Sequence, residues 1–258
     1  MILIMNRNKF KYPVTIFCIL NVLFPILLGL ILSFDYVPFQ WFPGISAIVL
    51  TILVEGKTGF DILLKRIAIK VKYYKWYFIS IIYPVIISFF AFCIVSYYMN
   101  GDISFPKLNY SIKQYSLIFL AIIWGSIGEE LGWRGFMLPL LSKRHSLFKS
   151  SLIIGLFWGI WHMYFFSGVY VFLIYLVLTI EFTLVMAWIQ RKIHGNIVAS
   201  IISHSSFNIC AILFFKGILI SENSNNLFLI YSAIVVLSTI PCLIIITKHH
   251  ILEYYLSK

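Results

Sequence analysis

Charged residues are scarce in this sequence, and acidic residues are the scarcest of them. Only 11% of the 258 residues are Asp, Glu, Lys or Arg, whereas soluble domains carry about a quarter. Hydrophobic residues make up 61% of the chain and form runs of the length that crosses a bilayer, which is roughly 20 residues. This composition excludes an ordinary soluble domain and predicts an all-α, polytopic membrane protein.

Several kinds of catalytic motif are also missing. All three aspartates, Asp35, Asp61 and Asp102, fall in predicted loops or interfacial segments, which excludes an intramembrane pair of aspartates. The sequence contains no His-Glu-x-x-His metalloprotease motif and no Gly-x-Ser-x-Gly nucleophile motif. The four cysteines lie singly inside apolar runs, so neither a disulfide framework nor a paired metal motif is indicated.

Short polar breaks separate the apolar runs. We expect a membrane helix bundle of about eight transmembrane helices, forming one domain over residues 1–258. The predicted spans are approximately residues 13–33, 38–54, 76–99, 115–141, 149–167, 169–190, 197–216 and 227–247. Such a bundle has the lipid bilayer as its first partner, because its apolar faces need a lipid surround.

The 20 Lys and Arg residues are distributed unevenly over the predicted connections. Sixteen fall on the side that holds both termini, three fall on the opposite side, and Arg134 lies inside a span. Because cytoplasmic loops carry an excess of Lys and Arg, this asymmetry predicts cytoplasmic N- and C-termini. It also accounts for the net charge of +11, so no nucleic-acid partner is expected. A composition rich in Ile, Asn, Lys, Phe and Tyr favours a bacterial plasma membrane.

One connection has helical periodicity of its own. In Gly56–Lys75, apolar residues recur at helical spacing against a basic face. They are Phe60, Leu63, Leu64, Ile67 and Val71. This pattern predicts an amphipathic helix that lies in the cytoplasmic membrane interface.

The run from residue 115 to 141 contains three charged side chains in otherwise apolar sequence. They are Glu129, Glu130 and Arg134, in the sequence Gly-Glu-Glu-Leu-Gly-Trp-Arg. A charge at the centre of a membrane helix costs about 2.5–3.5 kcal/mol on insertion scales. Three such charges on one span therefore indicate a functional site.

Polar residues on neighbouring spans are predicted to lie at a similar depth. A helix rises about 1.5 Å per residue. This places Glu129 and Glu130 at roughly 17 Å from the cytoplasmic end of their span, and His162 at roughly 20 Å. His204 lies at roughly 10 Å and Asn208 at roughly 17 Å. The common depth predicts one polar layer in the cytoplasmic half of the bundle.

Helical spacing predicts which of these residues can meet. Glu130 and Arg134 are four residues apart, so they share a helix face and can form an ion pair. Glu129 is rotated away from Arg134 and can face another helix. His204 and Asn208 also share a face, which offers an imidazole and an amide together.

Each of these residues has a structural interpretation as well. A single histidine in a membrane more often bonds to a neighbouring helix than takes part in catalysis. The pair Glu130–Arg134 is open to interpretation as a structural ion pair. Glu181, in the sixth predicted span, is better explained as a hydrogen-bonding or cavity-lining residue than as a catalyst.

Taken together, these polar residues indicate a particular chemistry more specifically than any one of them does. Glu129, His162, His204 and Asn208 together provide a general base, a proton shuttle and donors for an oxyanion. With no suitable nucleophilic cysteine or serine motif, glutamate and histidine suit the activation of a water molecule.

Three motifs in order on these spans resemble one known family. The pattern Glu-Glu-x-x-x-Arg, a histidine motif on the next span and His-x-x-x-Asn resemble the CAAX prenyl endopeptidase and bacteriocin-processing family, also called CPBP or Abi. The family consists of intramembrane proteases with about eight spans. The resemblance covers Ala121 to Ile212, which places the catalytic core at about 115–216.

The resemblance implies a role for each catalytic residue. Glu129 and His162 would hold and deprotonate the water that attacks a scissile peptide carbonyl. His204 and Asn208 would donate hydrogen bonds to the developing oxyanion. The substrate would be a peptide or protein at the membrane.

The resemblance also implies supporting residues. Glu130 and Arg134 would brace the helix and orient the substrate backbone. The histidine motif of the family is Phe-x-x-x-His, whereas Trp158 stands four residues before His162 here. The aromatic character is kept, and a reshaped wall of the site is expected.

Two questions remain open at the level of the sequence. A metal-free mechanism is expected, with Zn²⁺ held by Glu129, His162 and His204 as the alternative, because the same residues serve both. The rival to a protease is a non-catalytic bacteriocin-immunity or scaffold protein of the same family. A proton-coupled transporter that uses the membrane glutamates is less consistent with the sequence, because the chain shows little of an inverted repeat.

Overall fold

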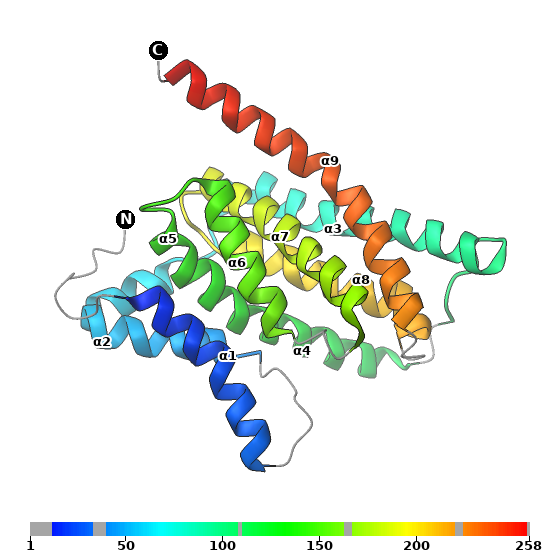
Figure 1. The fold of residues 1–258 in the computed structure, drawn as a ribbon, viewed down its shortest axis with the longest axis horizontal. Helices are drawn as coiled ribbons and strands as arrows, with labels where there is room; N and C mark the ends of the chain where they lie inside the picture. Colours follow the sequence, from blue (N-terminus) through cyan, green and yellow to red (C-terminus); the bar gives the residue numbers. More distant parts are fainter. Residues whose placement is uncertain (1–11, 33–39, 108–109, 163–166, 220–223, 257–258) are drawn as a thin grey trace.

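The computed structural model describes residues 12–32, 40–107, 110–162, 167–219 and 224–256. In these ranges every regular element is helical (Figure 1), which confirms the predicted all-α class. The long helices are α1 (Pro13–Leu32), α2 (Phe42–Lys65), α3 (Tyr74–Asn100), α4 (Ile112–Glu130), α6 (Leu147–Trp161), α7 (Val169–Lys192), α8 (Val198–Leu219) and α9 (Ser224–Leu256). The short elements are the 3₁₀-helix η1 (Val71–Tyr73), the π-helix η2 (Leu131–Met137) and α5 (Leu138–Leu141).

Several of these helices have the length and composition of membrane spans. Within the part of the chain that the structure describes, five helical segments qualify: Val71–Asn100, Ile112–Leu141, Val169–Lys192, Val198–Lys216 and Asn225–Lys248. Two further apolar helices, Pro13–Leu23 and Leu147–Trp161, are shorter. The chain is therefore a bundle of membrane-length helices, and the predicted number of about eight spans is approximate.

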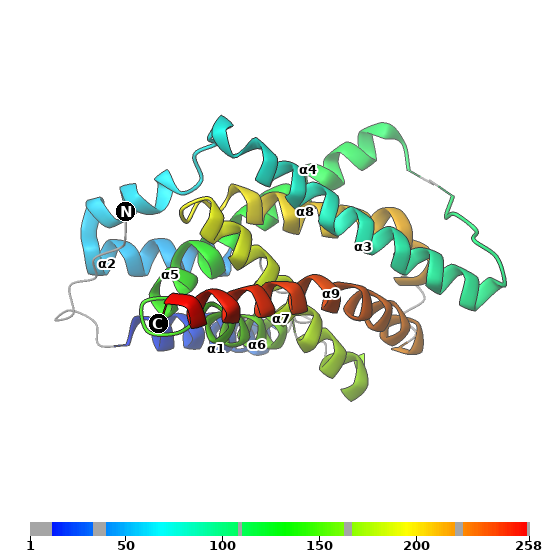
Figure 2. The same cartoon turned by 90° about the horizontal axis from the view of Figure 1, so that it is seen from above.

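The helices run back and forth between two ends of the molecule. In Figure 2 the connections α2–α3, α5–α6 and α7–α8 and the end of α9 lie toward the left. The connections α3–α4 and α8–α9 lie toward the right (Figure 2). The connections on the left are those in which most of the basic residues were counted, so the positive charge gathers at one end of the bundle.

The amphipathic segment is shorter than predicted. The helix ends at Lys65 rather than at Lys75, and Val71 begins a 3₁₀ turn with 82% of its surface exposed. Within α2, Gly56 has φ of 65° and ψ of −153°, a conformation that a residue without a Cβ adopts easily. The predicted helix over Gly56–Lys75 is thus corrected to a broken helix followed by a turn.

Long-range hydrogen bonds explain why this helix stops. The backbone N–H of Ile197 donates to the carbonyl of Arg66 at 3.0 Å. Nδ2 of Asn196 donates to the carbonyl of Ala68 at 2.8 Å. Because these carbonyls are bound by the connection between α7 and α8, the segment leaves the helix there. The local pattern in Gly56–Lys75 does not indicate a hydrogen-bond partner so distant in the sequence.

Glycines allow α2 to approach α4 and η2 closely. A Cβ at Gly128 would lie 2.8 Å from the ring of Trp41 and 2.9 Å from the carbonyl of Gln40. A Cβ at Gly132 would lie 2.6 Å from the backbone of Pro43. The helix therefore packs its glycine face against the start of α2. At about 100° per residue, the two glutamates between these glycines are turned toward the rest of the bundle.

Candidate active site

The two glutamates and the arginine of the charged motif lie where α4 passes into the π-helix η2. Glu129 and Glu130 end α4, and Arg134 lies in the middle of η2. Their exposed fractions are 1%, 0% and 0%. Short π-helical segments are rare and occur frequently at functional sites. The local backbone thus agrees with a functional interpretation of the motif.

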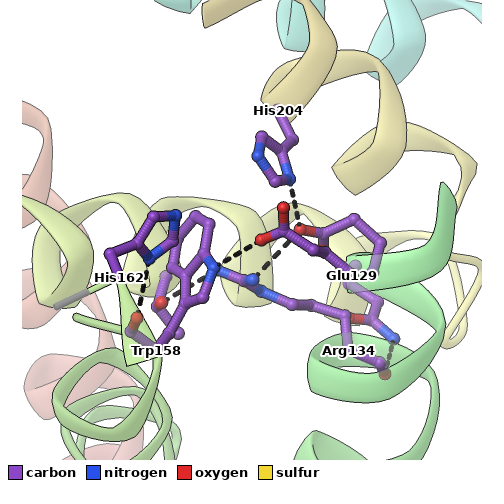
Figure 3. Close-up of polar contacts among 8 residues, drawn as sticks. Glu129, Arg134, Trp158, His162 and His204 are labelled. Carbon is purple, nitrogen blue, oxygen red and sulfur yellow. Dashed lines mark hydrogen bonds and ion pairs between the residues drawn. The ribbon is translucent and has the colours of Figure 1, made fainter. Parts of the chain in front are cut away.

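Glu130 and Arg134 form the ion pair that their spacing predicts. Nη1 of Arg134 donates to Oε1 of Glu130 at 3.0 Å (Figure 3). Nδ1 of His204 donates to the same oxygen, also at 3.0 Å. Nη2 of Arg134 donates to Oγ1 of Thr183 at 2.9 Å, so α7 also holds the guanidinium. The pair therefore has partners from α7 and α8, as a buried pair needs.

Glu129 faces another helix, α6, as its rotation on α4 predicts. Nε1 of Trp158 on α6 donates to Oε2 of Glu129 at 2.7 Å. The guanidinium carbon of Arg134 lies 4.2 Å from the centre of the Trp158 ring, which is a cation–π contact. Trp158 thus touches both charged groups. Phenylalanine, the residue of the family motif, has no N–H with which to make the first of these contacts.

The two histidines lie on opposite edges of this tryptophan. The ring centre of Trp158 is 5.6 Å from that of His162 and 5.2 Å from that of His204. Nδ1 of His162 lies 2.8 Å from the carbonyl of Trp158. Because a carbonyl only accepts, Nδ1 carries the proton and Nε2 is the acceptor in neutral His162. Figure 3 shows Glu129 and both imidazoles gathered around Trp158.

Asn208 is the fourth predicted catalytic residue. It lies on α8, one helical turn beyond His204, in the wall of a cavity of about 120 Å³. None of the contacts among the described residues joins it to Glu129, His162 or His204. Tyr175 lines the same cavity, and its ring centre lies 5.2 Å from that of His162. The catalytic role of Asn208 therefore stays a prediction.

Glu181 lies outside this group. Oγ1 of Thr239 on α9 donates to Oε1 of Glu181 at 2.7 Å, and Oγ of Ser238 donates to Oε2. The sulfur of Cys242 lies 3.5 Å from the carbonyl oxygen of Glu181. These contacts agree with the interpretation of Glu181 as a hydrogen-bonding residue between helices.

The site residues that the structure describes are not arranged as a metal site. Among the described residues, no three His, Cys, Asp or Glu side chains converge as the ligands of one ion. Glu129 accepts from Trp158, His204 faces Glu130, and Nδ1 of His162 faces a backbone carbonyl. The alternative zinc set of Glu129, His162 and His204 does not fit this arrangement, so no chemical step is assigned to a metal.

Three residues that support the site were missed in the sequence. Besides Thr183, these are Gln190, whose Nε2 donates to the carbonyl of Arg134 at 3.0 Å, and Arg66, whose Nη1 donates to the carbonyl of Gly135 at 2.5 Å. Thr183 and Gln190 are seven residues apart, on one face of α7, and that spacing was an available signal. Arg66 belongs to a basic cluster in which nothing distinguishes it.

Comparison with known proteins bears on the segment that carries the site. Residues 111–210 match the sequence model of the family described as type II CAAX prenyl endopeptidase Rce1-like. The predicted family resemblance is confirmed. The CAAX prenyl endopeptidase-like segment runs from the start of α4 into α8, and all the predicted site residues lie within it.

A curated relative supports the same resemblance. CAAX prenyl protease 2 of Methanococcus maripaludis is 27% identical to this chain over 113 residues. The aligned part covers 39% of this chain and 41% of the relative, so the chain spans well under half of the relative's length in this match. At the level of the family, these similarities support an intramembrane endopeptidase, and the apolar helices indicate an integral membrane protein.

Proposed function

We propose that this protein is an intramembrane endopeptidase that hydrolyses a peptide bond of a membrane-associated peptide or protein. The observation that carries the proposal is the fully buried carboxylate of Glu129, which accepts from the N–H of Trp158, the residue whose ring contacts both imidazoles. Such a group is expensive to keep inside an apolar bundle, and it lies in the segment that matches the family.

The proposed mechanism begins with the activation of water. The N–H of Trp158 donates to Oε2 of Glu129. The other oxygen, Oε1, accepts a proton from a water molecule as that water attacks the scissile carbonyl. His162 directs Nε2 to the same water as an acceptor, because its Nδ1 proton is bound to the carbonyl of Trp158. The carbonyl carbon gains a C–O bond and becomes tetrahedral. When the C–N bond breaks, the proton held by Glu129 passes to the leaving amine.

The second part of the mechanism is stabilisation of the oxyanion. Glu130 fixes His204 at Nδ1, and the protonated imidazole donates from Nε2 to the negative oxygen. Asn208 is the second proposed donor, and it can serve a substrate that reaches the wall of the neighbouring cavity. The ion pair of Glu130 and Arg134 holds His204 in this orientation. No metal ion takes part in the proposed steps.

We also propose the membrane and the orientation in which the protein lies. The gathering of basic residues at one end of the bundle supports cytoplasmic termini, and the composition supports a bacterial plasma membrane. The substrate would then reach the site from the membrane or from its cytoplasmic face.

Substitution of Glu129 tests the proposal. Glu129→Gln keeps an oxygen that accepts from Trp158 but removes the base, so we expect cleavage to fall by about 10²–10⁴-fold, the usual contribution of a general base. The measurement is mass spectrometry of peptides from membranes that contain the wild-type or variant protein. Glu181→Gln is the matched control, because it also neutralises a membrane glutamate. Wild-type cleavage by the Glu129 variant would favour the non-catalytic immunity or scaffold alternative.

A further inference from the structure

The cavity that Asn208 lines lies between four helices. Its volume is about 120 Å³, and residues of α3, α7, α8 and α9 form its wall. The interiors of proteins leave few voids larger than a water molecule, because side chains interdigitate closely. A cavity of this size, kept open inside a helix bundle, therefore indicates an occupant.

Two residues of the wall connect the cavity to the two imidazoles of the candidate active site. Asn208 follows His204 by one helical turn on α8. The ring centre of Tyr175 on α7 lies 5.2 Å from that of His162. The cavity is thus bounded by the neighbours of both histidines. A substrate bound between the histidines can reach it directly.

The chemistry of the wall selects an apolar occupant. Phe207 and Phe215 of α8 and Ile234 of α9 provide aromatic and aliphatic surface, and the rings of Tyr175 and Tyr231 pack together at 5.2 Å. Of the described residues that line the cavity, none carries a charge. A charged group without a partner is expensive to place in apolar surroundings. The wall therefore accepts an apolar side chain and rejects a charged one.

The volume limits the size of that side chain. An apolar cavity of about 150 Å³ binds one benzene molecule. By this measure, a cavity of about 120 Å³ has room for about five carbon atoms. This is the size of a leucine or isoleucine side chain, whereas the side chains of phenylalanine and tryptophan are larger.

We propose that this cavity binds the side chain of the substrate residue that precedes the scissile bond, and that it selects leucine, isoleucine or valine there. The inference rests on the proposed function, in which Asn208 donates to the oxyanion. That oxyanion forms on the carbonyl of the residue before the scissile bond. The side chain of this residue is attached to the adjacent carbon atom, so a carbonyl oxygen bound by Asn208 places the side chain at the wall of the cavity.

Two residues of the wall allow the cavity to be narrowed or enlarged. Ala211→Leu adds three carbon atoms to the wall, so it should favour alanine over leucine before the scissile bond. Ile234→Ala removes three carbon atoms, so it should favour phenylalanine over leucine. One methylene in an apolar pocket changes kcat/KM by about 10–200-fold, so we expect each ratio to change by at least about tenfold.

The measurement compares substrates within one preparation. The full-length protein is reconstituted in liposomes with a library of apolar peptides, and mass spectrometry identifies the new C-terminal residue of each product. Loss of folded protein lowers the cleavage of all peptides together, so it leaves the ratios unchanged. Ala121→Leu is the matched control, because it makes the same substitution at an exposed position of α4. Its ratios should equal those of the wild type.

The outcomes separate this inference from the proposed function. Products that end in leucine, isoleucine or valine, with opposite shifts in the two cavity variants, would support the inference. Unchanged ratios in both variants, with cleavage still dependent on Glu129, would overturn it and leave the proposed function intact. Selection of the residue after the scissile bond, or of a farnesylated cysteine before it, would also overturn it. Cleavage by the wild type no greater than that by Glu129→Gln would overturn both.

Discussion

Glutamates occur at two places inside the apolar helices, and they differ in the groups that surround them. Glu129 and Glu130 are fully buried beside a guanidinium and two imidazoles. Glu181 is partly buried, and its carboxylate accepts from the hydroxyls of Ser238 and Thr239. The first group includes imidazoles, a type of side chain that commonly carries protons in enzymes, whereas the second offers only hydroxyl groups.

The difference shows that depth in a membrane does not by itself define a catalytic site. At both places, carboxylates lie in apolar surroundings, which costs free energy. At Glu181, the hydroxyl partners offset that cost and join α7 to α9, which is a structural role. Partners that carry or exchange charge allow the same functional group to accept and return a proton. Substitutions at the two places test this difference.

The largest effect is expected from Arg134→Gln. This change leaves Glu130 buried without its guanidinium partner, and breaking a buried ion pair on one side costs about 3–5 kcal/mol. The measurement is the free energy of unfolding in detergent micelles, together with peptide cleavage. Glu181→Gln has no cation to lose and should cost much less. If both variants lose the same stability, the ion pair does not distinguish the two places.

A double variant separates the pair from its surroundings. Glu130→Gln combined with Arg134→Gln removes both charges, so it should recover part of the stability lost by Arg134→Gln alone. Cleavage should stay low, because His204 loses the carboxylate that orients it. A double variant as unstable as the single one would show that the uncompensated charge is not the cause.

The next effect concerns the tryptophan that distinguishes this chain from the family motif. Trp158→Phe keeps an aromatic ring under Arg134 but removes the N–H that binds Glu129. A hydrogen bond to a charged group contributes about 1.5–3 kcal/mol, so we expect cleavage to fall by roughly 10–100-fold. The fall should be in kcat, with little change in KM, because Trp158 acts on the base.

A second tryptophan provides the control for this change. Trp133→Phe alters a fully buried indole whose Nε1 has no hydrogen-bond partner among the described residues and whose ring packs against Phe17. It should affect stability without a specific loss of kcat. Equal loss of kcat in the two variants would mean that the N–H of Trp158 does not position Glu129.

Local features of this arrangement could be predicted from the sequence, whereas long-range features could not. The apolar runs predict the membrane-length helices, because composition and length set both properties. The spacing of Glu130 and Arg134 predicts their pairing, because both lie on one helix face. The end of α2 at Lys65 was not predictable, because Asn196 and Ile197 cause it from far along the chain.

The relative rotation of helices limits the prediction of the site in the same way. The sequence places His204 and Asn208 on one face of α8, but it does not say which neighbour each meets. In the structure His204 meets Glu130, and Asn208 lines a neighbouring cavity. The π-helix that presents Arg134 was also missed, because no spacing rule distinguishes it from an α-helix.

The smallest effect is expected from Glu181→Gln, and it tests the comparison most directly. The amide still accepts from Thr239, and hydrogen bonds between membrane helices average only about 0.6 kcal/mol. The variant should therefore melt within a few degrees of the wild type and keep its cleavage of peptides. Measurement of cleavage from pH 5 to 8 adds a sharper criterion, because a proton-transfer group would change the profile when neutralised. An unchanged profile would keep Glu181 in its structural role. A shifted profile, or a loss of activity like that of Trp158→Phe, would place this carboxylate in the chemistry and remove the distinction between the two sites.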